Sequence, residues 1–340
     1  MGEGVYENLS INSFRPADQC ILRSQVMKKI SIITPCYNEE VNVEICAHEL
    51  RQVMQKQLAG YDYEHIFADN ASTDSTLSKL REMAKKDKHI KVIANSRNVG
   101  PFRNMWNGMK SATGDAVVPQ LAADLQDPPS VIPEFVKNWE AGFLVTYGVR
   151  AKREEALIMR IARGLYYRII KKFAAAVIPL NSGEFLLADK KVIDSILAVD
   201  DQYPYIRGLI AQTGVKSTSV SYTWVRRERG KSKNNFISLI DQAINGFVST
   251  SRVPARLALL GGFILSLLGF AYAVFTVVMA FISEGSSPVG IPTIIVGIFL
   301  LGGVQLLFLG LIGEYILSIH GQVRRTPPMF EIERINFKGK

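Results

Sequence analysis

Short apolar segments alternate with amphipathic segments through the first hundred residues, and this order constrains the fold more than any other feature. Residues 30–34, 65–68 and 90–94 each have the length and apolar character of a buried strand. The segments between them, 39–58 and 77–84, carry apolar residues at the spacing of a helix that packs one face on a sheet. Strands and helices in this alternation predict an α/β domain with a Rossmann-like, mostly parallel sheet.

A further apolar segment begins at Val117 and leads into polar residues before two prolines stop it. Asp124, Gln126 and Asp127 are therefore expected at the carboxyl end of a strand, the edge where open α/β sheets bind ligands. Since Asp124 and Gln126 are two residues apart, an extended backbone would direct both side chains to one side. Such a pair suits a hard divalent cation that also takes phosphate oxygens. A solvated strand end is the alternative for this stretch taken alone.

Two other expected strand ends, 35–40 and 69–74, carry polar residues that suit a nucleoside. Tyr37 can stack on a base, Asp69 can accept from a base N–H group, and Glu39 can accept from ribose hydroxyls. Neither segment contains a GxGxxG or GxxxxGK[ST] loop, so a dinucleotide fold or P-loop site is not predicted. The alternative for Ser72 and Asp74 is a helix cap.

The net charge limits the classes of partner that are expected, and the cysteine content limits the compartment. The net charge of +9 suits phosphorylated substrates or anionic lipid. Nucleic acid is not expected as a partner, because no basic stripe with interleaved aromatic residues is present. The three cysteines, Cys20, Cys36 and Cys46, are odd in number and lack CxxC spacing. A reducing compartment is therefore predicted, without a disulfide framework or zinc site.

Two long uncharged apolar runs, 257–282 and 291–311, predict a hairpin of two transmembrane helices. Buried core helices are the alternative. Arginines flank the pair on both outer sides, whereas the connecting loop carries only Glu284. The positive-inside rule then places both termini and the α/β domain in the cytoplasm, at the cell membrane. Residues 156–177 have the pattern of an interfacial helix, with a soluble packed helix as the alternative.

These patterns divide the chain into five parts. They are a loosely ordered N-terminal extension (1–28), the α/β domain (29–235), an amphipathic juxtamembrane helix (236–255), the two transmembrane helices (256–317) and a cytoplasmic C-terminal tail (318–340). The first part lacks the apolar core of a signal peptide.

Four motifs follow one another in a family-specific order: Pro-Cys-Tyr-Asn-Glu-Glu at 35–40, Asp-Asn-Ala-Ser-Thr-Asp at 69–74, Arg-Asn-Val-Gly at 97–100, and Ala-Ala-Asp-Leu-Gln-Asp-Pro-Pro at 122–129. In this the chain resembles the GT-A family 2 glycosyltransferases, and more narrowly the polyprenyl-phosphate glycosyltransferases. The resemblance extends over about residues 28–330. It implies inverting transfer of a sugar from a nucleoside diphosphate sugar, UDP-glucose or a similar UDP-sugar, to a polyprenyl phosphate. It also implies Mg²⁺ or Mn²⁺ as cofactor and a homo-oligomer, a tetramer.

The resemblance also assigns roles to residues. The donor nucleotide-sugar would be bound by Pro35, Tyr37, Glu39, Asp69, Asp124, Gln126, Arg227 and Lys233. The metal ion would be bound by Asp124 and Gln126, and the acceptor phosphate by Arg150, Arg207 and Glu184. Asp124, Asp127 and Arg150 would be catalytic. A helix cap before Pro128 is the alternative role for Asp127, and a solvated basic loop is the alternative for Arg227 and Lys233.

Three departures from the family pattern stand beside these assignments. Ala122 occupies a position where the family often has a metal-binding aspartate, and Asn70 replaces a second aspartate. Residues 181–185 resemble an acceptor-side loop, but leucines follow where an arginine is usual. Ala122 is the main argument for the alternative function, a non-catalytic membrane scaffold of glycosyltransferase fold. A processive polysaccharide synthase is not expected, since no Gln-x-x-Arg-Trp motif is present.

Overall fold

The computed structural model describes residues 27–151, 179, 181–199, 201, 204–225, 261–265, 267–269, 271–272, 274–275, 278, 290–324 and 329–337. Several predicted segments lie outside these residues. They are nearly all of the N-terminal extension, the interfacial helix at 156–177, the basic loop with Arg227 and Lys233, the juxtamembrane helix at 236–255, and much of the first apolar run.

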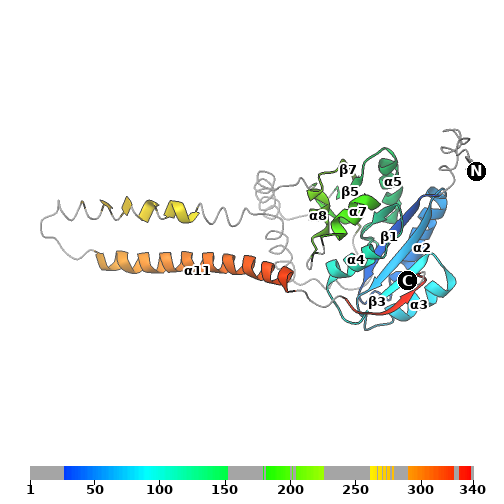
Figure 1. The fold of residues 1–340 in the computed structure, drawn as a ribbon, viewed down its shortest axis with the longest axis horizontal. Helices are drawn as coiled ribbons and strands as arrows, with labels where there is room; N and C mark the ends of the chain where they lie inside the picture. Colours follow the sequence, from blue (N-terminus) through cyan, green and yellow to red (C-terminus); the bar gives the residue numbers. More distant parts are fainter. Residues whose placement is uncertain are drawn as a thin grey trace, which may run out of the picture.

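The described residues form a mixed eight-stranded sheet in the order β7-β5-β6-β4-β1-β2-β3-β8 (Figure 1). The strands are β1 (Lys29–Cys36), β2 (Asp62–Asp69), β3 (Ile90–Asn95), β4 (Ala116–Val118), β5 (Val145–Arg150), β6 (Ser182–Asp189), β7 (Ser217–Tyr222) and β8 (Glu331–Ile335). β4, β1, β2 and β3 pair in parallel, as do β5 and β7, whereas β6 and β8 are antiparallel to their neighbours. The predicted α/β fold with a parallel central sheet is therefore confirmed.

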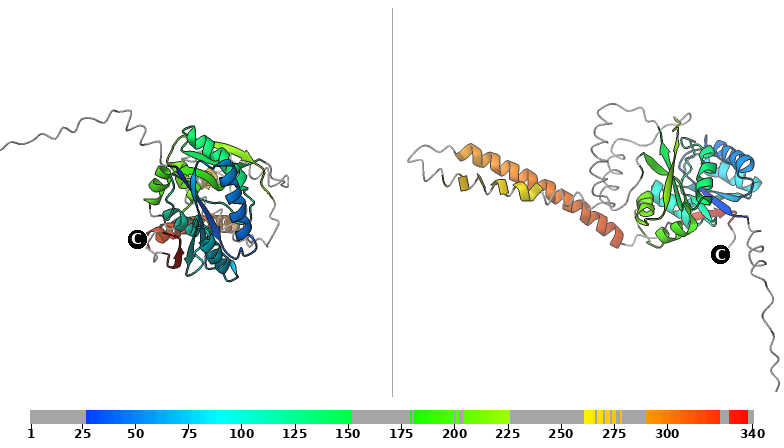
Figure 2. Two further views of the ribbon diagram at one scale, coloured as in Figure 1. Left: turned by 90° about the vertical axis from the view of Figure 1, so that its right-hand side faces the viewer. Right: turned by 90° about the horizontal axis from the view of Figure 1, so that it is seen from above.

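Helices cover both faces of this sheet (Figure 2). They are α2 (Val43–Gln57), α3 (Thr76–Lys86), α4 (Pro101–Lys110), α5 (Ile132–Glu140), α7 (Lys190–Leu197) and α8 (Ile206–Gln212). Alternate residues of β1 face opposite layers, as the pleat of a strand requires. Ile30 and Ile32 pack with residues of α2 and α5, whereas Ile33 packs with residues of α4, α7 and α8.

The C-terminal part of the chain extends away from the sheet and returns to it. Helix α11 (Gly290–Val323) projects from the α/β domain, and the described pieces of 261–278 lie beside it (Figure 1). No helix qualifies as a membrane span when length and apolarity are judged over the described residues alone. After α11 the chain adds edge strand β8 to β3.

The segment 143–149, for which a further strand was also predicted, contains most of β5, whereas three strands were not predicted. β6 begins inside the segment expected to be an acceptor-side loop, and β7 follows α8. β8 comes from residues expected only as a tail. The strand expected from Val117 is the three-residue β4, and a turn follows it instead of extended backbone.

Candidate active site

The polar residues singled out in the sequence gather at one edge of the sheet. β1 lies between β2 and β4 and is the point where the strand order reverses, so a ligand crevice is expected outside its carboxyl end. Tyr37 and Glu39 follow β1, Asp69 ends β2, and the 121–127 loop follows β4. Arg150 ends β5 at the same edge. The topology therefore brings together residues from four strand ends.

The loops after β1 and β2 are joined by hydrogen bonds centred on Asn38. The Asn38 backbone N–H donates to Ser72 Oγ (2.9 Å), and Asn38 Oδ1 accepts from the Thr73 backbone N–H (2.7 Å). Asn38 has a φ of 55°, a left-handed conformation that asparagine tolerates better than most residues. This side of the crevice is therefore held in place before any ligand binds.

Asp69 is fully buried at the end of β2 and keeps one oxygen without a partner. Its Oδ2 accepts from the Ser72 backbone N–H (3.1 Å), whereas Oδ1 is buried and has no hydrogen-bond partner among the described residues. Burial raises the pKa of this carboxyl group, and the hydrogen bonds from Ser72 only partly offset that effect. A buried, unsatisfied acceptor is costly, so this oxygen fits an N–H donor supplied by a ligand.

Asn70, which replaces an aspartate of the family pattern, holds a neighbouring loop. Its Oδ1 accepts from the Val99 backbone N–H, and its Nδ2 donates to Asn98 Oδ1, both at 2.9 Å. The second interaction needs a donor, which an aspartate lacks. Asn70 thus fixes the 98–100 loop beside the crevice.

Asp74 lies one residue before Ser75, the N-cap residue of α3, and its carboxylate binds the first residue of that helix. Its Oδ1 accepts from the Thr76 backbone N–H at 3.0 Å and from Thr76 Oγ1 at 2.5 Å. Burial opposes ionisation of Asp74, but these hydrogen bonds outweigh it and lower the pKa. Glu39 is oriented by the side-chain amide of Asn42, which donates to Glu39 Oε2 at 2.6 Å.

The predicted geometry of Asp124 and Gln126 is wrong, although both residues lie at the expected edge. The Leu125 backbone N–H donates to the Ala122 carbonyl (3.0 Å), and Leu125 has a φ of 57°. The backbone therefore turns between Asp124 and Gln126, and the two-residue repeat of a strand does not apply. The Gln126 backbone N–H donates to Asp124 Oδ1 (3.3 Å).

The side-chain oxygens of this turn fit a divalent cation that takes most of its ligands from substrate phosphates and water. The described residues contain no group of three or more His, Cys, Asp or Glu side chains that could hold a metal ion. Mg²⁺ is commonly held by one or two protein carboxylates together with substrate phosphates and water. Asp124, half-buried at the crevice, supplies a ligand of that kind.

Asp127 and Arg150 form a buried ion pair that includes Tyr222. Arg150 Nη2 lies 3.1 Å from Asp127 Oδ1 and 3.3 Å from Oδ2, and the Tyr222 hydroxyl donates to Oδ1 at 2.5 Å. Burial opposes the charge of Arg150, but Asp127 raises its pKa overall. Asp127 therefore binds Arg150 and Tyr222 rather than capping the turn at Pro128. Tyr222 was not among the predicted site residues. Its position just before the basic loop is the only signal in the sequence that could have indicated it.

Arg207 and Glu184, predicted on the acceptor side, lie together near the start of β6. Arg207 Nε is 3.5 Å from Glu184 Oε1 and 2.7 Å from the Tyr205 hydroxyl, and Arg207 Nη1 donates to the Ser182 carbonyl. Ser182 is the register partner of Val149, next to Arg150. The predicted acceptor residues thus occupy adjoining strand ends.

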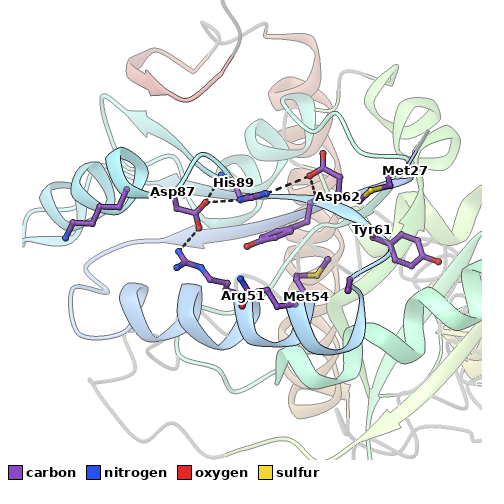
Figure 3. A pocket seen from close by; sticks show the side chains of 11 residues that line it. Met27, Arg51, Met54, Tyr61, Asp62, Asp87 and His89 are labelled. Atoms are coloured by element: carbon purple, nitrogen blue, oxygen red, sulfur yellow. Dashed lines mark hydrogen bonds and ion pairs between the residues drawn. The ribbon is translucent and has the colours of Figure 1, made fainter. Parts of the chain in front are cut away.

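A pocket of about 540 Å³ lies at the opposite edge of the sheet (Figure 3). Its polar side chains pair with one another: Arg51 lies 2.5 Å and His89 2.9 Å from Asp87. It is lined from the starts of β2 and β3, whereas ligands of open α/β sheets bind at the carboxyl ends. We therefore place the candidate active site at the other edge.

Comparison with known proteins identifies the family of the chain. The family model described as Glycosyl transferase family 2 matches residues 31–197. The uncharacterized glycosyltransferase YkcC of Bacillus subtilis is 34% identical over 298 residues, covering 87% of this chain and 91% of that protein. The chain belongs to glycosyltransferase family 2. The SfII prophage-derived bactoprenol glucosyl transferase of Shigella flexneri is 30% identical over 300 residues, covering 88% of this chain and 96% of that protein.

Among solved structures, the mannosyltransferase PcManGT from Pyrobaculum calidifontis, in complex with GDP-Man and Mn²⁺, is 17% identical. It covers 88% of each chain with a TM-score of 0.48. Family membership makes this glycosyltransferase an enzyme, and the scaffold alternative is set aside.

Proposed function

We propose that this glycosyltransferase transfers a sugar from a UDP-sugar such as UDP-glucose to a polyprenyl phosphate, with inversion at the anomeric carbon. The observation that carries the donor half is the buried Oδ1 of Asp69 at the carboxyl edge of the sheet, which no described residue pairs. The acceptor half is supported by the similarity to bactoprenol glucosyl transferases and by the cationic groups at the end of β5 and the start of α8.

In this proposal the donor base lies against the end of β2. Asp69 Oδ1 accepts from a base N–H group, which satisfies an oxygen that has no hydrogen-bond partner among the described residues. Pro35 and Tyr37, both half-buried, contact the base from the end of β1, and Glu39 accepts from the ribose. Arg227 and Lys233, outside the described residues, would close over the diphosphate.

Asp124 and Gln126 would hold Mg²⁺ or Mn²⁺ against the diphosphate. When bound, such an ion stabilises the negative charge that develops on the departing diphosphate. Asp124 carries the only carboxylate of the 122–124 triplet, so we expect metal binding to depend on it.

The transfer step needs no strong general base. One oxygen of the acceptor phosphate, already anionic near neutral pH, attacks the anomeric carbon and forms the new C–O bond. The bond from that carbon to the diphosphate breaks, and its electron pair leaves with the nucleoside diphosphate. Arg150 and Arg207 hold the acceptor phosphate, since a guanidinium group can donate two parallel hydrogen bonds to phosphate oxygens.

We also propose that the apolar segments 257–282 and 291–311 cross the cell membrane, with both termini and the catalytic domain cytoplasmic. Large apolar side chains along α11 support this: Ile298, Leu306 and Leu309 are each more than 60% exposed to solvent in the isolated chain. A Ser286→Cys variant tests the orientation. Labelling of that cysteine by a membrane-impermeant reagent from the cytoplasmic side alone would contradict it.

A transfer assay tests the activity. Full-length protein in detergent, incubated with labelled UDP-glucose, undecaprenyl phosphate and Mg²⁺ or Mn²⁺, should yield a labelled lipid. A panel of other labelled UDP-sugars covers a different sugar preference. We expect Asp124→Asn to abolish transfer while the protein remains folded. Near-normal turnover of Asp124→Asn in excess metal would contradict the metal assignment, and no labelled lipid with any donor would contradict the proposal.

A further inference from the structure

Tyr222 is fixed at the end of β7 directly beside Arg150. The two residues are register partners in the parallel pair of β5 and β7. The tyrosine ring is 5% exposed and packs edge-on against Phe185, with ring centroids 5.5 Å apart. Gly148 makes room for the ring, since a Cβ atom there would lie 2.9 Å from Tyr222 Cε1. Packing therefore determines where the hydroxyl group points.

The hydroxyl group connects both members of the buried ion pair. It donates to Asp127 Oδ1 at 2.5 Å and accepts from Arg150 Nε at 3.3 Å. Arg150 Nη2 closes the ring of contacts by donating to Asp127. Burial, followed by the Asp127 carboxylate, raises the pKa of Tyr222, so the hydroxyl group keeps the proton that it donates.

These contacts leave one edge of the guanidinium group available. All side-chain hydrogen bonds of Arg150 within the described residues are made by Nε and Nη2, which among these residues leaves Nη1 for an anion. The Trp224 ring lies 5.3 Å from the guanidinium carbon and supports one face of the group. Because the side chain of Arg150 is 22% exposed, an anion can reach it from the crevice.

We propose that Tyr222 is a positioning residue for the acceptor: together with Asp127, its hydroxyl group holds the Arg150 guanidinium in the orientation that receives a phosphate monoester. This inference rests on the proposed function, in which that monoester belongs to a polyprenyl phosphate. Tyr222 itself does not contact the reacting atoms. Its effect arises because a planar guanidinium group binds phosphate well only in a suitable orientation.

Tyr222→Phe tests this inference, since it removes the hydroxyl group and keeps the ring. Tyr147→Phe is the matched control, because Tyr147 is a 2% exposed tyrosine on β5 that makes no contact with Asp127 or Arg150 among those described. Binding of farnesyl phosphate to the full chain in detergent is measured by calorimetry, with inorganic phosphate and UDP as separate probes. We expect Tyr222→Phe to weaken farnesyl phosphate binding roughly tenfold or more, without altering UDP binding or the melting temperature. Tyr147→Phe should change none of these.

Two further readouts separate positioning from a general structural role. In the transfer assay, Tyr222→Phe should raise KM for undecaprenyl phosphate and leave KM for the UDP-sugar unchanged. In an Arg150→Lys background, which lacks the planar fork, Tyr222→Phe should have little further effect on farnesyl phosphate binding. Similar affinity for inorganic phosphate and farnesyl phosphate would identify free phosphate as the ligand chemistry and overturn the assignment to the acceptor.

Equal farnesyl phosphate binding by wild type and Tyr222→Phe would overturn the inference, as would a wild type that binds no farnesyl phosphate. An equal loss of UDP binding would also overturn it, because it would indicate general disruption. If farnesyl phosphate binds in a Tyr222-dependent manner but no sugar is transferred, the proposed function fails while this inference stands.

Discussion

Two buried carboxylates on β2, Glu64 and Asp69, have opposite surroundings although they are only five positions apart. Glu64 is 1% exposed and surrounded by donors: Ser31 Oγ and Lys91 Nζ at 2.5 Å, and the Thr113 backbone N–H at 2.6 Å. Lys29 Nζ lies 3.1 Å away as a second cation. Asp69 is fully buried, and its Oδ1 has no partner among the described residues.

The pKa shifts of the two groups reflect this difference. Burial disfavours the charged form of both. At Glu64 the hydrogen bonds from Lys91, Ser31 and Thr113 outweigh burial and lower the pKa to about 2. At Asp69 burial outweighs the hydrogen bonds from Ser72 and raises the pKa. A buried carboxylate whose oxygens all accept hydrogen bonds stabilises the fold. A buried carboxylate with an oxygen that lacks a donor costs stability and is available to a ligand.

The largest effect on stability should come from removing the Glu64 carboxylate. We expect Glu64→Ala to destabilise the catalytic domain by about 3–5 kcal/mol, because it leaves two cations at the base of the sheet without their counterion. Thermal unfolding of the full chain in detergent measures this. Glu44→Ala is the control: its partner Lys79 is on the surface, where such pairs contribute about 0–1 kcal/mol. Similar melting temperatures for the two variants would contradict the structural role of Glu64.

A smaller effect should appear as a pH dependence. Since the pKa of Glu64 falls from 4.5 to about 2 on folding, its ionisation stabilises the folded state above about pH 4.5. That stabilisation, about 3 kcal/mol, is lost as the pH falls from about 4.5 to about 2. Asp69 has the opposite sign, because its raised pKa makes its ionisation destabilising. Between pH 2 and 6, the free energy of unfolding should change less steeply with pH in Glu64→Gln than in wild type. Equal slopes would contradict this.

The sequence predicted β1 to β4 but neither the edge strands β7 and β8 nor the antiparallel strand β6 inside the sheet. β1, β2 and β3 are apolar runs between amphipathic helices, so local pattern alone identifies them. β8 pairs with β3 across more than 200 residues, and no local pattern contains that pairing. Asp69 was placed correctly because parallel strands bring their carboxyl ends to one edge.

Contacts within the site were less predictable than its location. The contact of Asp127 with Arg150 and Tyr222 depends on the register of β5 and β7, which a single sequence does not specify. The turn at Leu125 depends on a left-handed φ at a leucine, a residue type that rarely adopts one. These two features decide how the Asp124 and Gln126 side chains are placed and which groups Asp127 contacts.

The smallest effect should come from a chain of buried amides that links the end of β2 to β8. Asn104 Nδ2 donates to the Ala68 carbonyl (2.7 Å), and Asn95 Nδ2 donates to Asn104 Oδ1 (2.8 Å). Asn107 Nδ2 donates to Asn95 Oδ1 (3.4 Å) and to Glu331 Oε1 (2.8 Å). We expect Asn107→Ala to lower stability by about 1 kcal/mol. An unchanged melting temperature would indicate that this chain does not hold β8.

Asp69→Asn tests the central claim most directly, that β2 carries a structural carboxylate at one end and a ligand-binding carboxylate at the other. Binding of UDP by calorimetry and thermal unfolding are measured on the same preparation, with Glu64→Gln beside it. We expect Asp69→Asn to weaken UDP binding about tenfold, because a charge-assisted hydrogen bond becomes a neutral one, and to keep or raise the melting temperature. Glu64→Gln should lower the melting temperature and leave UDP binding unchanged. Unchanged UDP affinity in Asp69→Asn, together with a lower melting temperature, would contradict the account.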